Sequence, residues 1–259
     1  MPSEPLLGAL RPAWTASPRV GALMSSRSGG VSAAPWDSLN LGTAVGDDPA
    51  HVAENRRRFI AATGAEPCWL QQVHGRTVLR AAPQVPGAPL PQADASWTDE
   101  PGIACIVQLA DCMPVLLAAP EGRAVAAAHA GWRGLAGGVV EAALRAVCEA
   151  AGCEPAELQV WLGPCIGPRQ FEVGADVLQA FGADAGQPAL RCFVPRAAAD
   201  GTPRWLADLQ GLAEDRLAAA GVRRLSAERA CTVEQASRFF SYRRDGRTGR
   251  MAAAVWIRG

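Results

Sequence analysis

The sequence predicts an α+β fold with mixed sheets. Short apolar runs that predict strands alternate with helical patterns, but the alternation has no regular period. The sequence shows no internal repeat at solenoid spacing. Neither GxGxxG nor GxxxxGK[ST] follows a predicted strand, so dinucleotide-binding and P-loop folds lack their main signature.

The first third of the chain predicts a long polar loop, one helix and two short strands. Residues 29–55 are rich in Gly, Ser, Asn and Asp, and they lead into a helix that begins near Pro49. Residues 68–73 (CWLQQV) predict a strand that ends at His74, and a second short strand follows. The proline-rich loop after it is too short to divide the chain. We therefore expect one domain over residues 1–259, with residues 1–18 as a loosely ordered segment.

The remaining elements follow from apolar runs and helical periodicity. Three short apolar runs predict buried strands, and apolar residues after His129 recur at helical spacing until Gly152 ends the helix. A further strand, two helices and a closing strand complete the chain. In order, the predicted segments are strands at 103–109, 114–120 and 124–129, a helix up to 151, a strand at 158–163, helices at 171–182 and 205–221, and a strand at 252–257.

Composition limits the classes of partner and the compartment. A chain of 259 residues with 49% hydrophobic residues can bury a sizeable core. Its 25 basic residues balance 25 acidic ones, so no overall field would gather nucleic acid or a membrane surface, and we expect a small-molecule substrate. No apolar run reaches ~18 residues and no secretory signal opens the chain, which predicts a cytoplasmic protein with eight reduced cysteines.

Three residues at predicted strand ends are candidates for a metal site. The chain has only three histidines; His74 and His129 both lie where a strand ends, and so does Cys112. Strand ends that gather on one side of a sheet form a common crevice. Two imidazoles and one thiolate would leave a fourth position open, as in catalytic zinc sites. The spacing alone also fits a small buried cysteine and a core histidine, so both interpretations stay open.

Nine ordered motifs carry a resemblance to a known family. They are GGVS, SLNLG, QVHG, DASW, ADCMP, AAAHAGWRG, WLGPCIGP, FEVG and FFSYRRDGRTGRMA, and they span about Gly29 to Ile257. The chain is similar to the YfiH-like family, also called the multicopper polyphenol oxidoreductase or laccase-domain family and described as purine nucleoside phosphorylase.

The resemblance implies both a fold and a function. It implies a layered, mixed-sheet single domain and a zinc ion held by His74, Cys112 and His129. It also implies phosphorolysis of adenosine, inosine, guanosine or methylthioadenosine, with adenosine deaminase activity in some members. Some bacterial members are named peptidoglycan editing factors. One departure is Ala44, which stands where many members have a histidine.

Ligand counting tests the family's inherited names. A multicopper laccase needs many imidazoles, and three histidines cannot furnish them. A single copper held by the same three residues with Met113 remains an alternative to zinc. Deaminases of the cytidine type need HxE and PCxxC, which this chain lacks. Asp111 is then the nearest candidate proton carrier, or else a carboxylate that accepts backbone N–H groups.

The residues directly after His129 form a candidate phosphate-binding site. A helix that begins at Gly131 would direct free N–H groups and its positive dipole end at an anion, beside Arg133. The alternative is a glycine turn that serves only close packing. Asn40 and Gln72 are candidates for ribose or purine contacts, because an amide both donates and accepts.

Arg243 is a further phosphate candidate, although it and Arg244 can instead pair with Asp245 on the surface.

The expected partners are a purine nucleoside and phosphate, and the expected state is a monomer. The main alternative makes Cys112 a nucleophile activated by His129, in a hydrolase or amidase acting on peptidoglycan precursors. A non-catalytic binding protein is the third hypothesis.

Overall fold

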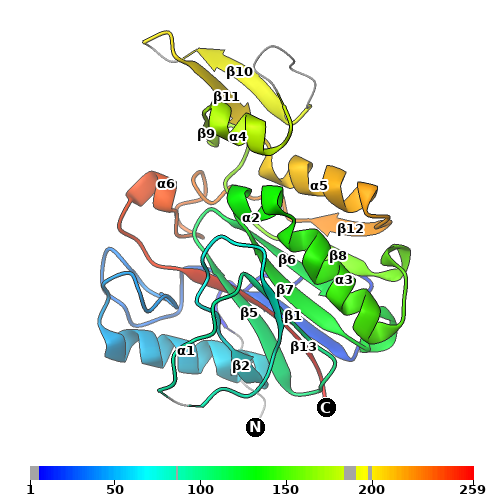
Figure 1. The fold of residues 1–259 in the computed structure, drawn as a ribbon. Helices are drawn as coiled ribbons and strands as arrows, with labels where there is room; N and C mark the ends of the chain where they lie inside the picture. The colour runs from blue at the N-terminus through cyan, green and yellow to red at the C-terminus, as the bar shows by residue number, and fades with distance from the viewer. Residues whose placement is uncertain (1–5, 86, 184–190, 198–199) are drawn as a thin grey trace.

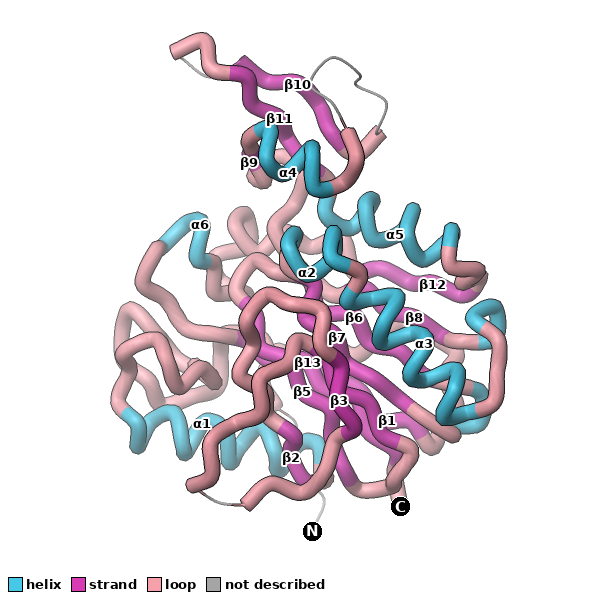
Figure 2. The backbone as a smooth tube through the Cα atoms, viewed as in Figure 1, coloured by secondary structure: helices cyan, strands magenta, loops and turns pink. Residues whose placement is uncertain are grey.

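The computed structural model describes residues 6–85, 87–183, 191–197 and 200–259. Two large sheets pack face to face, and a small sheet projects from one end (Figures 1 and 2). Both large sheets are mixed, which confirms the predicted α+β fold. The strands are β1 Val20–Met24, β2 Glu66–Cys68, β3 Val78–Arg80, β4 Ala95–Thr98, β5 Ile103–Leu109, β6 Met113–Ala118, β7 Val125–Ala130, β8 Gln159–Leu162, β9 Glu172–Val173, β10 Phe193–Ala197, β11 Pro203–Ala207, β12 Arg224–Ala227 and β13 Met251–Ile257. The helices are α1 Pro49–Thr63, α2 Trp132–Gly137, α3 Val139–Ala151, α4 Ala175–Ala180, α5 Leu209–Ala219 and α6 Tyr242–Asp245, with 3-10 turns at Pro120–Gly122 and Pro155–Glu157.

Strand order places the chemistry-bearing loops together. The four-stranded sheet has the order β1–β13–β5–β2, and the six-stranded sheet has the order β12–β8–β6–β7–β4–β3. The chain leaves the first sheet after β5 and enters the second at β6, so Cys112 lies in the connection between them. In the β6–β7 register, His129 pairs with Pro114, which brings it next to that connection.

Alternation along the strands creates three apolar layers. Every second residue of a strand faces the same side, so Val107 and Leu116 from different sheets share the core between the sheets. Ile106 faces the other way and packs with Phe59 of α1. Val115 packs with the face of α3 and α5. The order of layers is therefore helix, sheet, sheet, helix, and α2 and α6 lie at the end of this sandwich opposite the carboxyl terminus (Figure 1).

Several predicted elements are confirmed closely. Helix α1 begins at Pro49, after Asp48 accepts a hydrogen bond from the backbone N–H of Ala50. Strand β5 covers the predicted residues 103–109, and α3 ends at Gly152, whose φ of 58° is left-handed. Within the described residues, no helix has the length and apolarity required to cross a bilayer.

The predicted strand over residues 68–73 is wrong. Strand β2 ends at Cys68, and the chain reaches His74 with only an isolated bridge between Gln71 and Gln92. The reason is a side chain: Gln84 accepts a hydrogen bond from Trp69 N (3.0 Å) and donates one to Trp69 O (2.7 Å). These backbone groups are therefore unavailable to a neighbouring strand.

Three predicted helices have different bounds. The helix after His129 divides into α2 and α3 at Gly138, whose φ is 92°. The predicted helix at 205–221 begins late, because Trp205–Ala207 pair with β10 and α5 starts only after Asp208 caps it. The predicted helix at 171–182 consists of β9 and the short α4.

Of the expected loose segment 1–18, residues 1–5 lie outside the described residues, whereas Leu10 N–H donates to Met24 O (2.8 Å).

Candidate metal centre

His74, Cys112 and His129 converge at one end of the sandwich. One ligand atom from each lies within 4.8 Å of the others. Cys112 Sγ is 3.8 Å from His74 Nε2, and the two imidazole centroids are 4.9 Å apart. A shared zinc, at about 2.3 Å from sulfur and about 2.1 Å from nitrogen, can join atoms up to about 4.4 Å apart, so the measured sulfur–nitrogen pair fits. The structure thus brings the three predicted ligands together.

Asp94 organises two of these three ligands from behind. Its Oδ2 accepts hydrogen bonds from the backbone N–H groups of Val73 (3.1 Å) and Gly75 (2.7 Å), and its Oδ1 accepts one from His74 N (2.9 Å). These bonds hold His74 at a φ of 58°, a conformation that few non-glycine residues adopt. Oδ1 also lies 2.9 Å from Nδ1 of His129, which leaves Nε2 of that ring to face the cluster.

Sequence reasoning did not assign a role to Asp94. In the sequence its only mark is its place in the motif DASW. The structure shows that its carboxylate is fully buried, directly before β4. Buried carboxylates are rare unless they are paired or hydrogen-bonded.

The ligands set one another's charge. Burial raises the pKa of the Cys112 thiol, but the charge of His129 and hydrogen bonds from both histidines outweigh burial and lower that pKa to about 6. Burial lowers the pKa of His129, but Cys112 and Asp94 outweigh it and raise that pKa to about 9. Both pKa shifts favour the charged pair, a thiolate beside an imidazolium. A metal cation that binds here can displace a proton of the imidazolium and then supply the positive charge next to the thiolate.

Helix α2 begins directly beside the cluster. A Cβ added at its N-cap, Gly131, would lie 2.9 Å from Cys112 Sγ and 3.1 Å from His74 Cδ2, so no side chain fits there. The predicted helix start next to the cluster is therefore confirmed. Arg133 is exposed, and its guanidinium lies 4.2 Å over the ring of Trp132.

Asp111, the residue before Cys112, is buried and has a φ of 86°. Its Oδ1 accepts a hydrogen bond from Thr232 Oγ1 (2.6 Å), and its Oδ2 accepts one from the backbone N–H of Arg243 (2.7 Å). Both oxygens are thus engaged, which favours the interpretation of Asp111 as a hydrogen-bond acceptor. The Arg243 side chain donates to backbone carbonyls, and Arg244 pairs with Asp245 at 2.7 Å.

Asn40 and Gln72 are engaged within the protein. Asn40 is fully buried, and its Oδ1 accepts hydrogen bonds from Gly42 N (2.9 Å) and Arg250 N (2.8 Å). Gln72 exchanges two hydrogen bonds with the backbone of Gln108, at 2.8 and 2.7 Å. The structure places both amides as supports of neighbouring backbone rather than as free groups facing a ligand.

Comparison with known proteins then decides the family. The family model described as multi-copper polyphenol oxidoreductase laccase matches residues 21–258. This chain belongs to that family. A protein of Pseudomonas aeruginosa named purine nucleoside phosphorylase is 50% identical over 248 residues, which cover 96% of this chain and 98% of that protein. The Escherichia coli purine nucleoside phosphorylase YfiH is 45% identical over 250 residues, which cover 95% and 97%.

Solved structures agree with this membership of the laccase family. A Neisseria meningitidis protein of the DUF152 family model superposes with a TM-score of 0.88 at 43% identity, covering 97% of this chain and 100% of that chain. YlmD from Geobacillus stearothermophilus superposes with a TM-score of 0.83 at 31% identity, covering 96% and 98%. The resemblance carried by the nine sequence motifs is confirmed.

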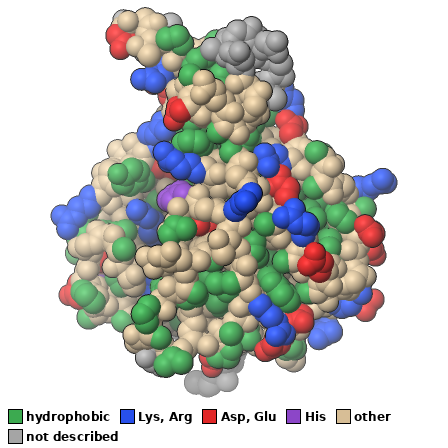
Figure 3. All heavy atoms as spheres, in the orientation of Figure 1, with side chains coloured by type: hydrophobic (Ala, Val, Ile, Leu, Met, Phe, Trp, Pro, Cys, Tyr) green, Lys and Arg blue, Asp and Glu red, His purple; other side chains and the backbone are tan. Residues whose placement is uncertain are grey.

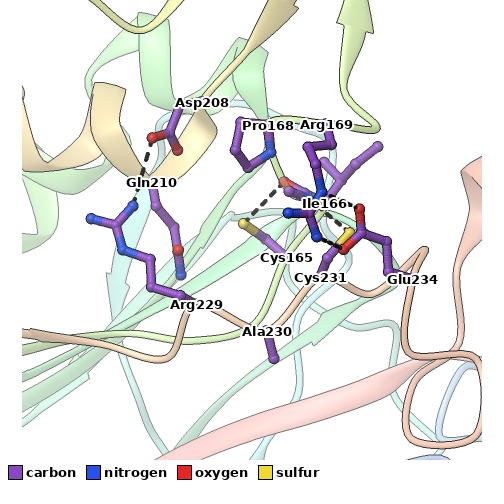
Figure 4. Close-up of a pocket in the computed structure, with 11 residues that line it drawn as sticks. Cys165, Ile166, Pro168, Arg169, Asp208, Gln210, Arg229, Ala230, Cys231 and Glu234 are labelled. Carbon is purple, nitrogen blue, oxygen red and sulfur yellow. Dashed lines mark hydrogen bonds and ion pairs between the residues drawn. The ribbon is translucent and has the colours of Figure 1, made fainter.

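A separate cavity, which His74, Cys112 and His129 do not line, lies between the segment after β8, the start of α5 and the segment after β12 in this laccase-family chain (Figure 4). Its volume is about 180 Å³, and Cys165 and Cys231 are part of its wall. The ionic side chains around it already pair with each other: Arg169 lies 2.6 Å from Glu234, and an arginine–aspartate pair closes the other side. The cavity therefore offers few free charges to a ligand. Cys105, Cys165 and Cys231 are buried, as expected for packing residues, and all eight cysteines are free.

Proposed function

We propose that this chain is a zinc-dependent purine nucleoside phosphorylase. It would convert adenosine, inosine, guanosine or methylthioadenosine and phosphate into the base and the ribose 1-phosphate product, with adenosine deamination as a second reaction of the same site. One observation carries the proposal: His74, Cys112 and His129 converge around one position, with Asp94 behind them, in a chain that resembles proteins of that name. We place it in the cytoplasm as a monomer, where its free cysteines suit a reducing compartment.

The donor set fits zinc. Zinc accepts both imidazole nitrogen and thiolate sulfur, and three protein ligands leave a fourth position open, as catalytic zinc sites require. Copper shares this preference and is the second candidate. When bound, the metal supplies a Lewis acid that polarises an oxygen of phosphate or nucleoside.

The chain's own residues prepare the site for that metal and for an anion. Asp94 keeps the ring of His129 oriented, and the lowered pKa of Cys112 favours its thiolate, the form that binds a metal. The exposed side chain of His74 leaves the cluster accessible from solvent. Figure 3 shows arginine side chains beside a histidine surface, and His74 is the exposed histidine of the described chain. The field of these arginines attracts phosphate although the chain as a whole has no net charge.

The first experiment compares the native protein with Cys112→Ser. We expect about one zinc per native chain and formation of ribose 1-phosphate from adenosine and phosphate. Cys112→Ser should lose both, because serine is a poor zinc ligand. Cys153→Ser changes a cysteine in the loop after α3 and should keep both. Turnover that survives both chelation and the loss of Cys112 sinks the proposal.

A cysteine hydrolase or amidase acting on peptidoglycan precursors is the second candidate. The observation in its favour is the lowered thiol pKa of Cys112, 3.8 Å from an imidazole nitrogen. Bound zinc would occupy that thiolate and suppress attack. The two functions therefore predict opposite responses to chelation: the phosphorylase loses activity, whereas the hydrolase gains it.

A further inference from the structure

We propose that Arg250 binds the phosphate co-substrate beside the metal centre. The inference rests on the proposed phosphorylase function and identifies the residue that holds its anionic substrate. It differs from the sequence-based expectation, which placed phosphate at Arg133 and the first turn of α2.

The loop with the sequence SLNLG fixes the position of Arg250. The backbone N–H of Arg250 donates to Asn40 Oδ1 (2.8 Å), and its carbonyl accepts from Leu41 N (3.0 Å). Gly42 lies against the side chain: a Cβ there would come within 2.7 Å of Arg250 Cγ. Asn40 and Gly42 therefore position Arg250. The buried amide of Asn40 contributes to the site through this arginine.

The guanidinium of Arg250 keeps binding capacity. It is half-buried, and only Nη1 has acceptors, the carbonyls of Thr248 and Gly249, each at 3.1 Å. Across the described ranges no carboxylate forms an ion pair with it, and Nε and Nη2 have no hydrogen-bond acceptor. Strand pairing places Arg250 near the metal centre: the next residue, Met251, pairs with Leu109, and Cys112 follows Leu109 by three residues. The guanidinium lies 5.9 Å from the ring of Tyr242, at the start of α6, and the next backbone N–H of that helix donates to Asp111.

Neighbouring arginines are less suited to this role. Arg133 is exposed on the ring of Trp132, and Arg247 lies 4.5 Å over another indole ring and donates to a carbonyl. The Arg243 side chain is held by two backbone carbonyls. The sequence contains no lysine, so apart from the histidines and the proposed metal a cationic phosphate contact must come from an arginine. The planar guanidinium of Arg250 can offer Nε and Nη2 together to two phosphate oxygens.

The test uses the zinc-loaded protein with Arg250→Gln, Arg250→Lys, Arg133→Gln and the control Arg224→Gln. Arg224 is exposed on β12, at the far edge of the six-stranded sheet. Arg250→Gln should raise the KM for phosphate about 10- to 100-fold, because charge-assisted hydrogen bonds are lost, and leave the nucleoside KM and zinc content unchanged. Arg250→Lys should fall between, since it keeps the charge without the planar fork. Inorganic phosphate should raise the Tm of the native protein and of the control but not that of Arg250→Gln.

The outcomes separate this proposal from the proposed function. A native phosphate KM and Tm shift in Arg250→Gln overturn it, and their loss in Arg133→Gln alone would place phosphate at α2. If the native protein makes no ribose 1-phosphate, yet phosphate raises its Tm through Arg250, the phosphorylase function fails and the anion site stands. Should Arg250→Gln lose zinc, Arg250→Lys decides: a raised phosphate KM at full zinc content supports the proposal, and an unchanged one contradicts it.

Discussion

Asp94 supports two of the three proposed metal ligands at once, and this explains how the site can be rigid although His74 lies in a loop. Burial raises the pKa of its carboxyl, but His129 and the amides of Gly75 and Val73 outweigh burial and lower it. Asp94 is therefore a carboxylate with only acceptor atoms, matched to three backbone donors and one imidazole N–H.

Replacing Asp94 with Asn should weaken metal binding. An amide carries one NH2 group, which would face one of these donors and leave it unpaired. We expect zinc affinity to fall about 10- to 100-fold, the usual effect of losing the partner of a ligating histidine. Competition with a chromophoric chelator measures the affinity, and the absorption spectrum of the cobalt-loaded protein reports the ligand geometry. Asp99→Asn, at an exposed aspartate after β4, is the control. Unchanged affinity and spectrum would contradict the role of Asp94.

The thiol of Cys112 should titrate at low pH in the metal-free protein. Its pKa is lowered to about 6, so the thiolate predominates above that pH and is lost as the pH falls below it. The ultraviolet absorption of thiolate should therefore show a step near pH 6 that is missing in Cys112→Ser. Zinc affinity should weaken through the same range, because protons then compete for the sulfur. A step only at the ordinary thiol pKa would refute this assignment.

The sequence could predict the convergence of the three candidate ligands but not the residues that support them. His74, Cys112 and His129 are recognisable because histidines are few and all three residues adjoin predicted strand ends. Asp94 and Arg250 depend on contacts between distant segments: Asp94 meets His129 across 35 positions, and Asn40 meets Arg250 across 210. Spacing along the chain carries no signal for such pairs.

Elements with a local cause were predictable, and those decided by distant partners were not. Strand β5 is a continuous apolar run, and α1 has an Asp–Pro start. The break between α2 and α3 escaped detection because apolar spacing continues across it. The backbone at Gly138 is left-handed, which turns the chain without disturbing the shared apolar face.

Two neighbouring glycines test this break. Gly138→Ala should lower the free energy of unfolding by about 1 kcal/mol or more, because alanine is strained at a φ of 92°. Gly137→Ala is the matched control: Gly137 is the last residue of α2 and an added Cβ meets nothing within 4 Å, so the change should be neutral or stabilising by up to about 1 kcal/mol. Urea unfolding of both variants measures the difference. Equal effects would contradict a special role for Gly138.

The three proposed metal ligands connect the two large sheets of the molecule. His74 lies between β2 and β3, Cys112 lies between β5 and β6, and His129 belongs to β7. Since β2 and β5 belong to one sheet and β3, β6 and β7 to the other, an ion bound by all three residues would hold the two sheets together at this end of the sandwich.

Removing the metal should therefore destabilise the whole fold rather than one loop. A ligand that binds only the folded state adds RT ln(1 + [L]/Kd), so the Tm should rise with free zinc and fall after chelation. In Cys112→Ser this dependence should disappear. Calorimetry with and without zinc measures the Tm. If the Tm of the native protein does not change with zinc concentration, the result argues against a metal shared by the two sheets.

The carboxyl terminus lies at the end of the molecule remote from α2 and α6 (Figure 1). A bead, a fluorophore or a fused carrier attached at Gly259 would therefore point away from the entrance to the metal centre. The protein can be anchored by its carboxyl end with its reactive face turned outward, an orientation suited to an immobilised catalyst.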